Sequence, residues 1–122
     1  MVDYSANPSL HVDTTGDEGY RLSEYLFTAD GEPSKNMDIL DLPSPEGTTH
    51  VGIWWAKPGV YDHPGGGHET FYVFEGEAEF DLPSGTVHLA PGSVAHIPAN
   101  TPTQMRVTKE LRKIAFVIRP TS

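Results

Sequence analysis

The 122-residue chain contains no cysteine, which excludes disulfides and thiolate metal sites. No apolar run approaches the roughly 20 residues of a membrane-spanning helix, and the first ten residues lack the basic start and apolar segment of a secretory signal. Basic residues are scarce, since 8 Lys and Arg against 17 Asp and Glu give a formal net charge of −9. That balance argues against nucleic acid and anionic membranes as partners. We therefore expect a soluble cytoplasmic protein, and the charge by itself identifies no ligand.

Helical periodicity is also missing, whereas turn residues are plentiful, with 12 Gly and 11 Pro. Segments rich in β-branched and aromatic residues recur every ~8–12 residues with turn residues between them, which is typical of an all-β sandwich or barrel. A tight turn at Glu75-Gly76 is expected to join 70–74 and 77–82 into a hairpin. The other expected strands are 20–27, 37–42, 48–57, 86–89, 93–97, 103–107 and 112–118.

Residues 1–19 are polar and are expected to form an N-terminal arm before one β-barrel domain at 20–122. The arm is either loose or lies across a partner subunit. Trp54 and Trp55 are adjacent in an expected strand, so one can line the barrel while the other packs outside or on a partner. Because exposed strand edges favour pairing, we expect a homodimer.

The stretch Pro58–Gly76 organises the candidate site. Glycines at 65–67 let backbones approach closely, and the strand that follows should turn Glu69, Phe71 and Val73 inward by alternation. A glutamate among inward aromatic residues is costly unless it is paired or binds a cation. Glu69 is therefore the strongest single pointer to a functional site.

This stretch resembles the first motif of the cupins, G-x5-H-x-H-x3-4-E-x6-G. Glu69 takes the position of the motif glutamate relative to Gly76, and His63 takes that of the first histidine. Gly65 stands where the second histidine would be, and the opening glycine is displaced to Gly59.

A second cupin motif, G-x5-P-x-G-x2-H-x3-N, has a counterpart in which Gly92 and Pro98 match, while Asn100 and Thr103 replace the glycine and the histidine. The run LAPGSVAHIPANTPTQMRVTKELRKIAFVI resembles the small single-domain cupins related to the ethanolamine-utilisation cupin. The resemblance covers 51–118 and implies a small single-domain cupin, that is, a jelly-roll β-barrel.

The resemblance implies a cavity around His63 and Glu69. These two residues can ligate a divalent metal such as Zn, Ni, Mn or Fe, with His68 or Gln104 as the third ligand. Without a metal, they form an acid–base pair in an apolar cavity, where burial shifts pKa values. The remaining expected ligand-binding residues are Tyr61, Phe71, Met105 and Trp55.

Other polar residues are expected on the surface. His88 and His96 alternate with apolar neighbours and would be ligands only if their strands faced inward. Lys109, Arg112 and Lys113 surround Glu110 and are expected on a solvated turn.

Cupin folds host many activities, so the fold alone does not decide the function. Three classes stay open: an enzyme of the lyase, isomerase or dehydratase type acting on a small polar or carbonyl-bearing metabolite, a non-catalytic small-molecule-binding module, and a structural partner of a larger complex. The incomplete ligand set disfavours oxygen-activating iron chemistry, which usually needs two histidines and a carboxylate. We favour the enzyme.

Overall fold

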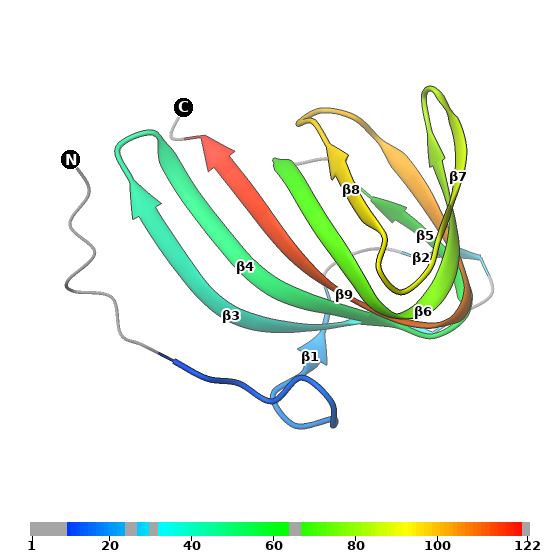
Figure 1. The fold of residues 1–122 in the computed structure, drawn as a ribbon, viewed down its shortest axis with the longest axis horizontal. Helices are drawn as coiled ribbons and strands as arrows, with labels where there is room; N and C mark the ends of the chain where they lie inside the picture. The colour runs from blue at the N-terminus through cyan, green and yellow to red at the C-terminus, as the bar shows by residue number, and fades with distance from the viewer. Residues whose placement is uncertain (1–9, 24–26, 30–31, 64–66, 121–122) are drawn as a thin grey trace.

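The computed structural model describes residues 10–23, 27–29, 32–63 and 67–120. These ranges contain nine strands and no helix, so the all-β expectation is confirmed (Figure 1). None of the described residues forms a helix able to cross a membrane. The strands are β1 Arg21–Leu22, β2 Phe27–Ala29, β3 Lys35–Ser44, β4 Gly47–Ala56, β5 Gly59–His63, β6 His68–Leu82, β7 Gly85–Leu89, β8 Val94–Ile97 and β9 Thr103–Pro120.

All nine strands belong to one antiparallel sheet that curves back on itself (Figure 1). The two longest strands, β6 with 15 residues and β9 with 18, run through the curve and connect its two sides. The start of β6 pairs with the end of β9, next to β4, β3 and β8, while the end of β6 pairs with the start of β9, next to β5 and β7. The result is two facing layers built from shared strands.

The prediction of a turn at Glu75-Gly76 is wrong, because β6 continues through these residues. The pairing of β6 with β9 shifts register around Glu75 and Glu77, which marks a β-bulge. Gly76 has a φ of +88°, and a Cβ there would clash with the Glu110 carbonyl and with Leu111. A glycine at this corner lets two backbones touch, so the strand bends without ending. The expected strands 103–107 and 112–118 are likewise one strand, β9.

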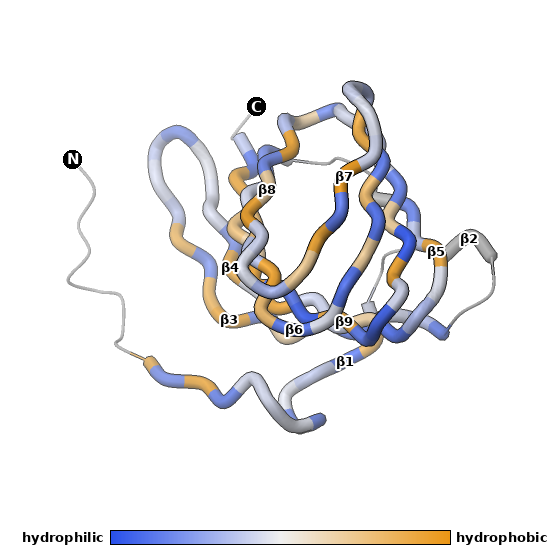
Figure 2. The backbone as a smooth tube through the Cα atoms, turned by 45° about the vertical axis from the view of Figure 1, so that its right-hand side comes forward, coloured by the Kyte–Doolittle hydropathy of each residue, from blue (hydrophilic) through white to orange (hydrophobic). Residues whose placement is uncertain are grey.

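The bulge also changes which residues of β6 point inward. Before the bend the buried positions are Glu69, Phe71 and Val73, which confirms the inward set expected from the sequence. After the bend they are Ala78 and Phe80, so the alternation moves by one residue at the corner. Figure 2 shows hydrophobic and hydrophilic positions alternating along the strands.

The core fills the space between the two layers. Phe71 packs edge-on against Phe80 across the fold, with ring centroids 5.7 Å apart, and Trp54 packs likewise against Tyr61 at 5.1 Å. Such edge-to-face pairs add to the stabilisation from apolar burial. The remaining core members are Ala56, Val73, Ala78, Leu89, Ile97, Met105, Val107 and Leu111.

Arg112 attaches part of the N-terminal arm to the outside of the sheet. Its guanidinium lies 4.0 Å from the ring centroid of Trp55 and 5.2 Å from that of Tyr20. It also donates hydrogen bonds to the carbonyl oxygens of Thr14 and Gly16. The expectation of a solvated turn is wrong for this arginine, because aromatic rings and arm carbonyls bury it.

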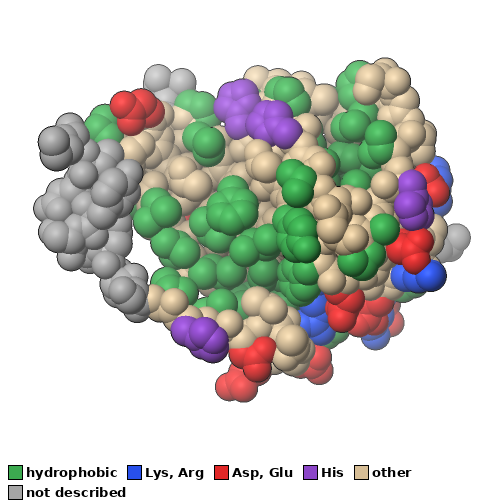
Figure 3. Space-filling view, in the orientation of Figure 1, with side chains coloured by type: hydrophobic (Ala, Val, Ile, Leu, Met, Phe, Trp, Pro, Cys, Tyr) green, Lys and Arg blue, Asp and Glu red, His purple; other side chains and the backbone are tan. Residues whose placement is uncertain are grey.

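An outer apolar face, defined here by Tyr72, Val94, Phe116 and Ile118, covers the outside of β6, β8 and β9. These side chains are 41%, 67%, 44% and 48% exposed. Tyr72 lies opposite Val94 in the register, and Phe116 and Ile118 lie on neighbouring β9. Figure 3 shows hydrophobic side chains gathered on this side of the molecule. Large exposed apolar patches mark interaction surfaces.

Candidate functional site

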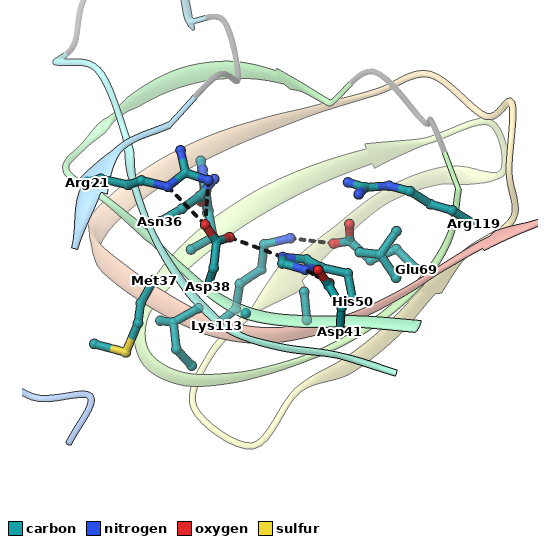
Figure 4. A pocket seen from close by; sticks show the side chains of 14 residues that line it. Arg21, Asn36, Met37, Asp38, Asp41, His50, Glu69, Lys113 and Arg119 are labelled. Atoms are coloured by element: carbon teal, nitrogen blue, oxygen red, sulfur yellow. Dashed lines mark hydrogen bonds and ion pairs between the residues drawn. The ribbon is translucent and has the colours of Figure 1, made fainter. Parts of the chain in front are cut away.

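A cavity of about 350 Å³ opens at the end of the fold farthest from the bend, against the inner side of β3, β4, β9 and the start of β6 (Figure 4). Its size is at the lower end of the range for small-molecule sites. Charged and polar side chains dominate its wall: Arg21, Asp38, Asp41, His50, Glu69, Lys113 and Arg119.

Glu69 and Lys113 form a buried ion pair in this wall. Lys113 Nζ lies 2.6 Å from Glu69 Oε2, and the two side chains are only 3% and 2% exposed. The ammonium also lies 4.1 Å from the ring centroid of Phe71 and 5.4 Å from that of Trp54. A buried carboxylate needs such a partner, and the aromatic faces favour a cation at the same point.

The sequence-based expectation that Lys113 lies on a solvated turn is wrong. Lys113 is in the middle of β9 and points inward with Leu111 and Val117. The residues around it are apolar on both faces of β9, so alternation alone gave no signal that it points inward. Lys109, by contrast, is exposed and pairs with Glu77 at the surface, as expected.

A second set of charges lies beside this ion pair, around His50 of β4, which is opposite Val117 of β9 in the register (Figure 4). His50 Nδ1 lies 2.6 Å from Asp41 Oδ1, and its Nε2 lies 3.2 Å from Asp38 Oδ1. Asp38 Oδ2 accepts hydrogen bonds from Nε and Nη2 of Arg21, at 2.9 Å and 2.5 Å. A neutral imidazole donates from one nitrogen only, so one of the two His50 contacts at most is a hydrogen bond while the ring is neutral. Both contacts can be hydrogen bonds only when the ring is protonated. None of these four residues was identified from the sequence.

The expected apolar ligand-binding residues are divided by the fold. Phe71, Tyr61 and Met105 are buried in the core. The Tyr61 hydroxyl lies 2.8 Å from the Lys57 carbonyl oxygen, and burial raises the pKa of this tyrosine above its ordinary value of 10.0. Trp55 lies on the outer side of the sheet, where its indole donates to Glu110 Oε2 at 3.0 Å.

The structure does not bring the expected third metal ligands to Glu69. His68 is exposed, and its Nδ1 accepts a hydrogen bond from the Ala99 amide at 3.1 Å. Gln104 donates to Asp62 Oδ1 at 3.3 Å, away from the cavity. The backbone of His63 ends β5 opposite Thr103, but its side chain lies outside the described residues. The pairing of His63 with Glu69 therefore stays a prediction.

The described residues do not fit a divalent metal at this position. The Glu69 carboxylate is already paired with an ammonium, whose charge repels a metal ion at the same oxygen. No three His, Asp or Glu side chains in the described ranges converge as a metal site. The expectation of Zn, Ni, Mn or Fe gains no support from these contacts. His88 and His96 are exposed, as expected.

The all-β fold and the sequence together place the chain among the cupins. The chain belongs to the family of the EutQ-like cupin domain, whose sequence model matches residues 43–115. These findings confirm the expected all-β cupin fold, although the described strands form an open sheet rather than a closed barrel.

Solved structures share this fold at low sequence identity. EutQ of Salmonella typhimurium LT2 has a TM-score of 0.62 at 15% identity, over 75% of this chain and 72% of that one. EutQ of Clostridium difficile has 0.56 at 20%, over 73% and 71%. Ectoine synthase of P. lautus has 0.61 at 18%, over 77% and 70%. These similarities concern the fold alone. Among curated proteins, none matches the sequence.

Proposed function

We propose that this cupin is an enzyme that moves a proton on a small carbonyl-bearing metabolite, with Glu69 and Lys113 as its acid–base pair and without a metal. The observation that carries the proposal is the 2.6 Å contact between Lys113 Nζ and Glu69 Oε2 in the cavity wall. The pair offers a carboxylate that can accept a proton and an ammonium that can stabilise an oxyanion. Ectoine synthase, an enzyme by its name, shows that this fold can carry catalysis.

The chemistry follows from the two roles. Glu69 takes a proton from the carbon next to the carbonyl group, and Lys113 donates a hydrogen bond to the carbonyl oxygen as it becomes an enolate. If the α-carbon carries a hydroxyl group, the intermediate is an enediolate, and return of the proton to the former carbonyl carbon gives an isomerase. Departure of a leaving group from the β-carbon instead gives a lyase or a dehydratase. Each outcome begins with the same proton abstraction.

Hydrogen–deuterium exchange tests that first step. The protein is incubated in D₂O with small ketones and oxo acids, and loss of the α-proton signal is followed by ¹H NMR. We expect exchange with at least one compound, slowed ~100-fold or more in Glu69→Gln and in Lys113→Met. Glu79→Gln is the matched control, because Glu79 contacts His88 on the surface. EDTA should leave the rate unchanged.

Two results would contradict the proposal: no exchange with any carbonyl compound, or exchange that both cavity variants leave intact.

A second function, a non-catalytic binding module, is favoured by the wall around His50, because Asp38 and Asp41 are already held in place by His50 and Arg21. Such a preformed wall is sufficient for binding alone. A ligand that binds without isotope exchange would select this second function.

A further inference from the structure

The acceptors in the cavity wall are already engaged. Asp38 pairs with Arg21 and His50, Asp41 pairs with His50, and Glu69 pairs with Lys113. Each carboxylate that lines the cavity therefore already contacts a nitrogen-bearing side chain of the cavity wall, which leaves little room for a cationic group of a ligand.

Hydrogen-bond donors, by contrast, remain available in the same cavity. Arg119 lines it and makes no ion pair or hydrogen bond with any described residue. Figure 4 shows its side chain extending over the cavity from the side of Glu69. Trp54 also lines the cavity, and its buried indole Nε1 has no hydrogen-bond partner in the described part of the chain. Buried donors normally find an acceptor, so the missing one points to a ligand.

Along β9 the Lys113 ammonium lies between Trp54 and Arg119, because the lysine side chain extends toward Glu69, which is opposite Val117. Lys113 and Trp54 lie opposite each other in the register of β9 and β4, and Arg119 lies further along β9. Between them, Ala115 of β9 lies opposite Gly52 of β4, and both line the cavity. These two small residues leave room for a short ligand that reaches both Trp54 and Arg119.

We propose that the substrate is a small oxo acid, whose carboxylate binds the Arg119 guanidinium and whose oxo oxygen accepts from Lys113 and the Trp54 indole. A guanidinium is the side chain best suited to bidentate binding of a carboxylate. An oxo oxygen at Lys113 also places the neighbouring carbon beside Glu69. This inference rests on the proposed function and names the substrate class for the same site.

The two tryptophans provide an internal test by NMR. A ¹H–¹⁵N spectrum of the full chain contains one indole signal each from Trp54 and Trp55, assigned with Trp55→Phe. The probes are pyruvate, acetoacetate and 4-oxopentanoate, in which the two functional groups are progressively further apart. Butanone and propylamine serve as the neutral and cationic comparisons. We expect a saturable shift of the Trp54 indole with at least one oxo acid. The Trp55 indole, which donates to Glu110 on the outer side, should not move.

Arg119→Gln should weaken the binding of that oxo acid at least roughly tenfold, as expected for loss of a charged bidentate partner. Arg106→Gln is the matched control. Arg106 is on β9, like Arg119, but it is exposed and lies near Asp81 of β6. The inference is overturned if no oxo acid shifts Trp54, if butanone or propylamine binds as tightly, or if Arg119→Gln binds unchanged.

The two proposals fail separately. If butanone exchanges its α-protons in a Glu69-dependent way and no oxo acid binds, the acid–base function stands and the oxo acid is ruled out as the substrate class. If an oxo acid binds through Arg119 and no isotope exchange occurs, the oxo acid stands as the ligand class and the acid–base function is ruled out.

Discussion

Lys113 reaches Glu69 along the strands rather than straight across them. In the register of β6 and β9, Lys113 lies opposite Val73, whereas Glu69 lies opposite Val117. The lysine side chain therefore extends toward the open end of the cavity, over Phe71, to meet the carboxylate at 2.6 Å. Its stem is covered by the core and its charge is presented to the cavity.

This ion pair should be strongly coupled in folding. Glu69→Leu or Lys113→Met alone leaves one buried charge without its partner, and each should lower the free energy of unfolding by about 3–5 kcal/mol. The double variant should lose less than the sum of the two, because no unpaired charge remains. Urea denaturation of the four proteins measures the coupling. Strictly additive losses would mean that the two groups do not interact in solution.

The bend at Gly76 should not tolerate a side chain. Gly76→Ala must adopt a φ of +88° and also displace the Glu110 backbone, so it should cost more than the about 1–2 kcal/mol of a left-handed residue alone. Gly92→Ala is the control, since Gly92 has a φ of +101° but nothing within 4 Å of a Cβ. Thermal or urea unfolding that shows equal losses for both would contradict the close approach at the corner.

The outer apolar face should be the interface of the expected homodimer, because its central side chains are uncharged in a chain of net charge −9. A charge buried there on association is costly. Val94→Lys should therefore weaken the dimer by roughly tenfold or more in dissociation constant, as measured by sedimentation. Val87→Lys introduces the same charge on β7, at a valine that is 38% exposed outside this face, and should leave the dimer intact. A wild-type chain that sediments only as the 13.3 kDa monomer at micromolar concentration would contradict the interface.

Stability should decline at alkaline pH. Burial raises the pKa of Tyr61 and of Tyr20 above 10.0, which favours the neutral phenols in the folded state. Their contribution is complete below the pKa of the unfolded chain and is lost as the pH rises from about 10 through the higher folded-state values. The urea midpoint should therefore fall above about pH 10, and less steeply in Tyr61→Phe. Equal slopes for the two proteins would show that Tyr61 does not contribute.

The sequence predicted the parts of the site that depend on local alternation and on motifs. Glu69 could be placed inward because it shares its face with Phe71 and Val73. Lys113 could not, because the residues around it on β9 are apolar on both faces of the strand. Alternation alone does not choose a side there.

The wall around His50 needed information that no single segment contains. Asp38 and Asp41 are three positions apart, so simple alternation would put them on opposite faces. The register of β3 against β4 shifts between Asp38 and Leu40, and that irregularity lets both carboxylates reach the same imidazole. Gly76 was likewise expected in a turn but lies at a β-bulge. A side chain there would clash with Glu110, and the local sequence does not reveal a contact with a residue so distant along the chain.

The change of alternation at the corner of β6 restricts how the length of this protein can vary. One residue added or removed between Val73 and Ala78 would exchange Ala78 and Phe80 for their acidic neighbours Glu77 and Glu79 in the interior. The tip at Pro83-Ser84 carries no such constraint, because both residues are exposed between β6 and β7. Inserted tags or reporter domains should be accepted at that tip and rejected at the corner, which a library of insertions screened for soluble expression would reveal.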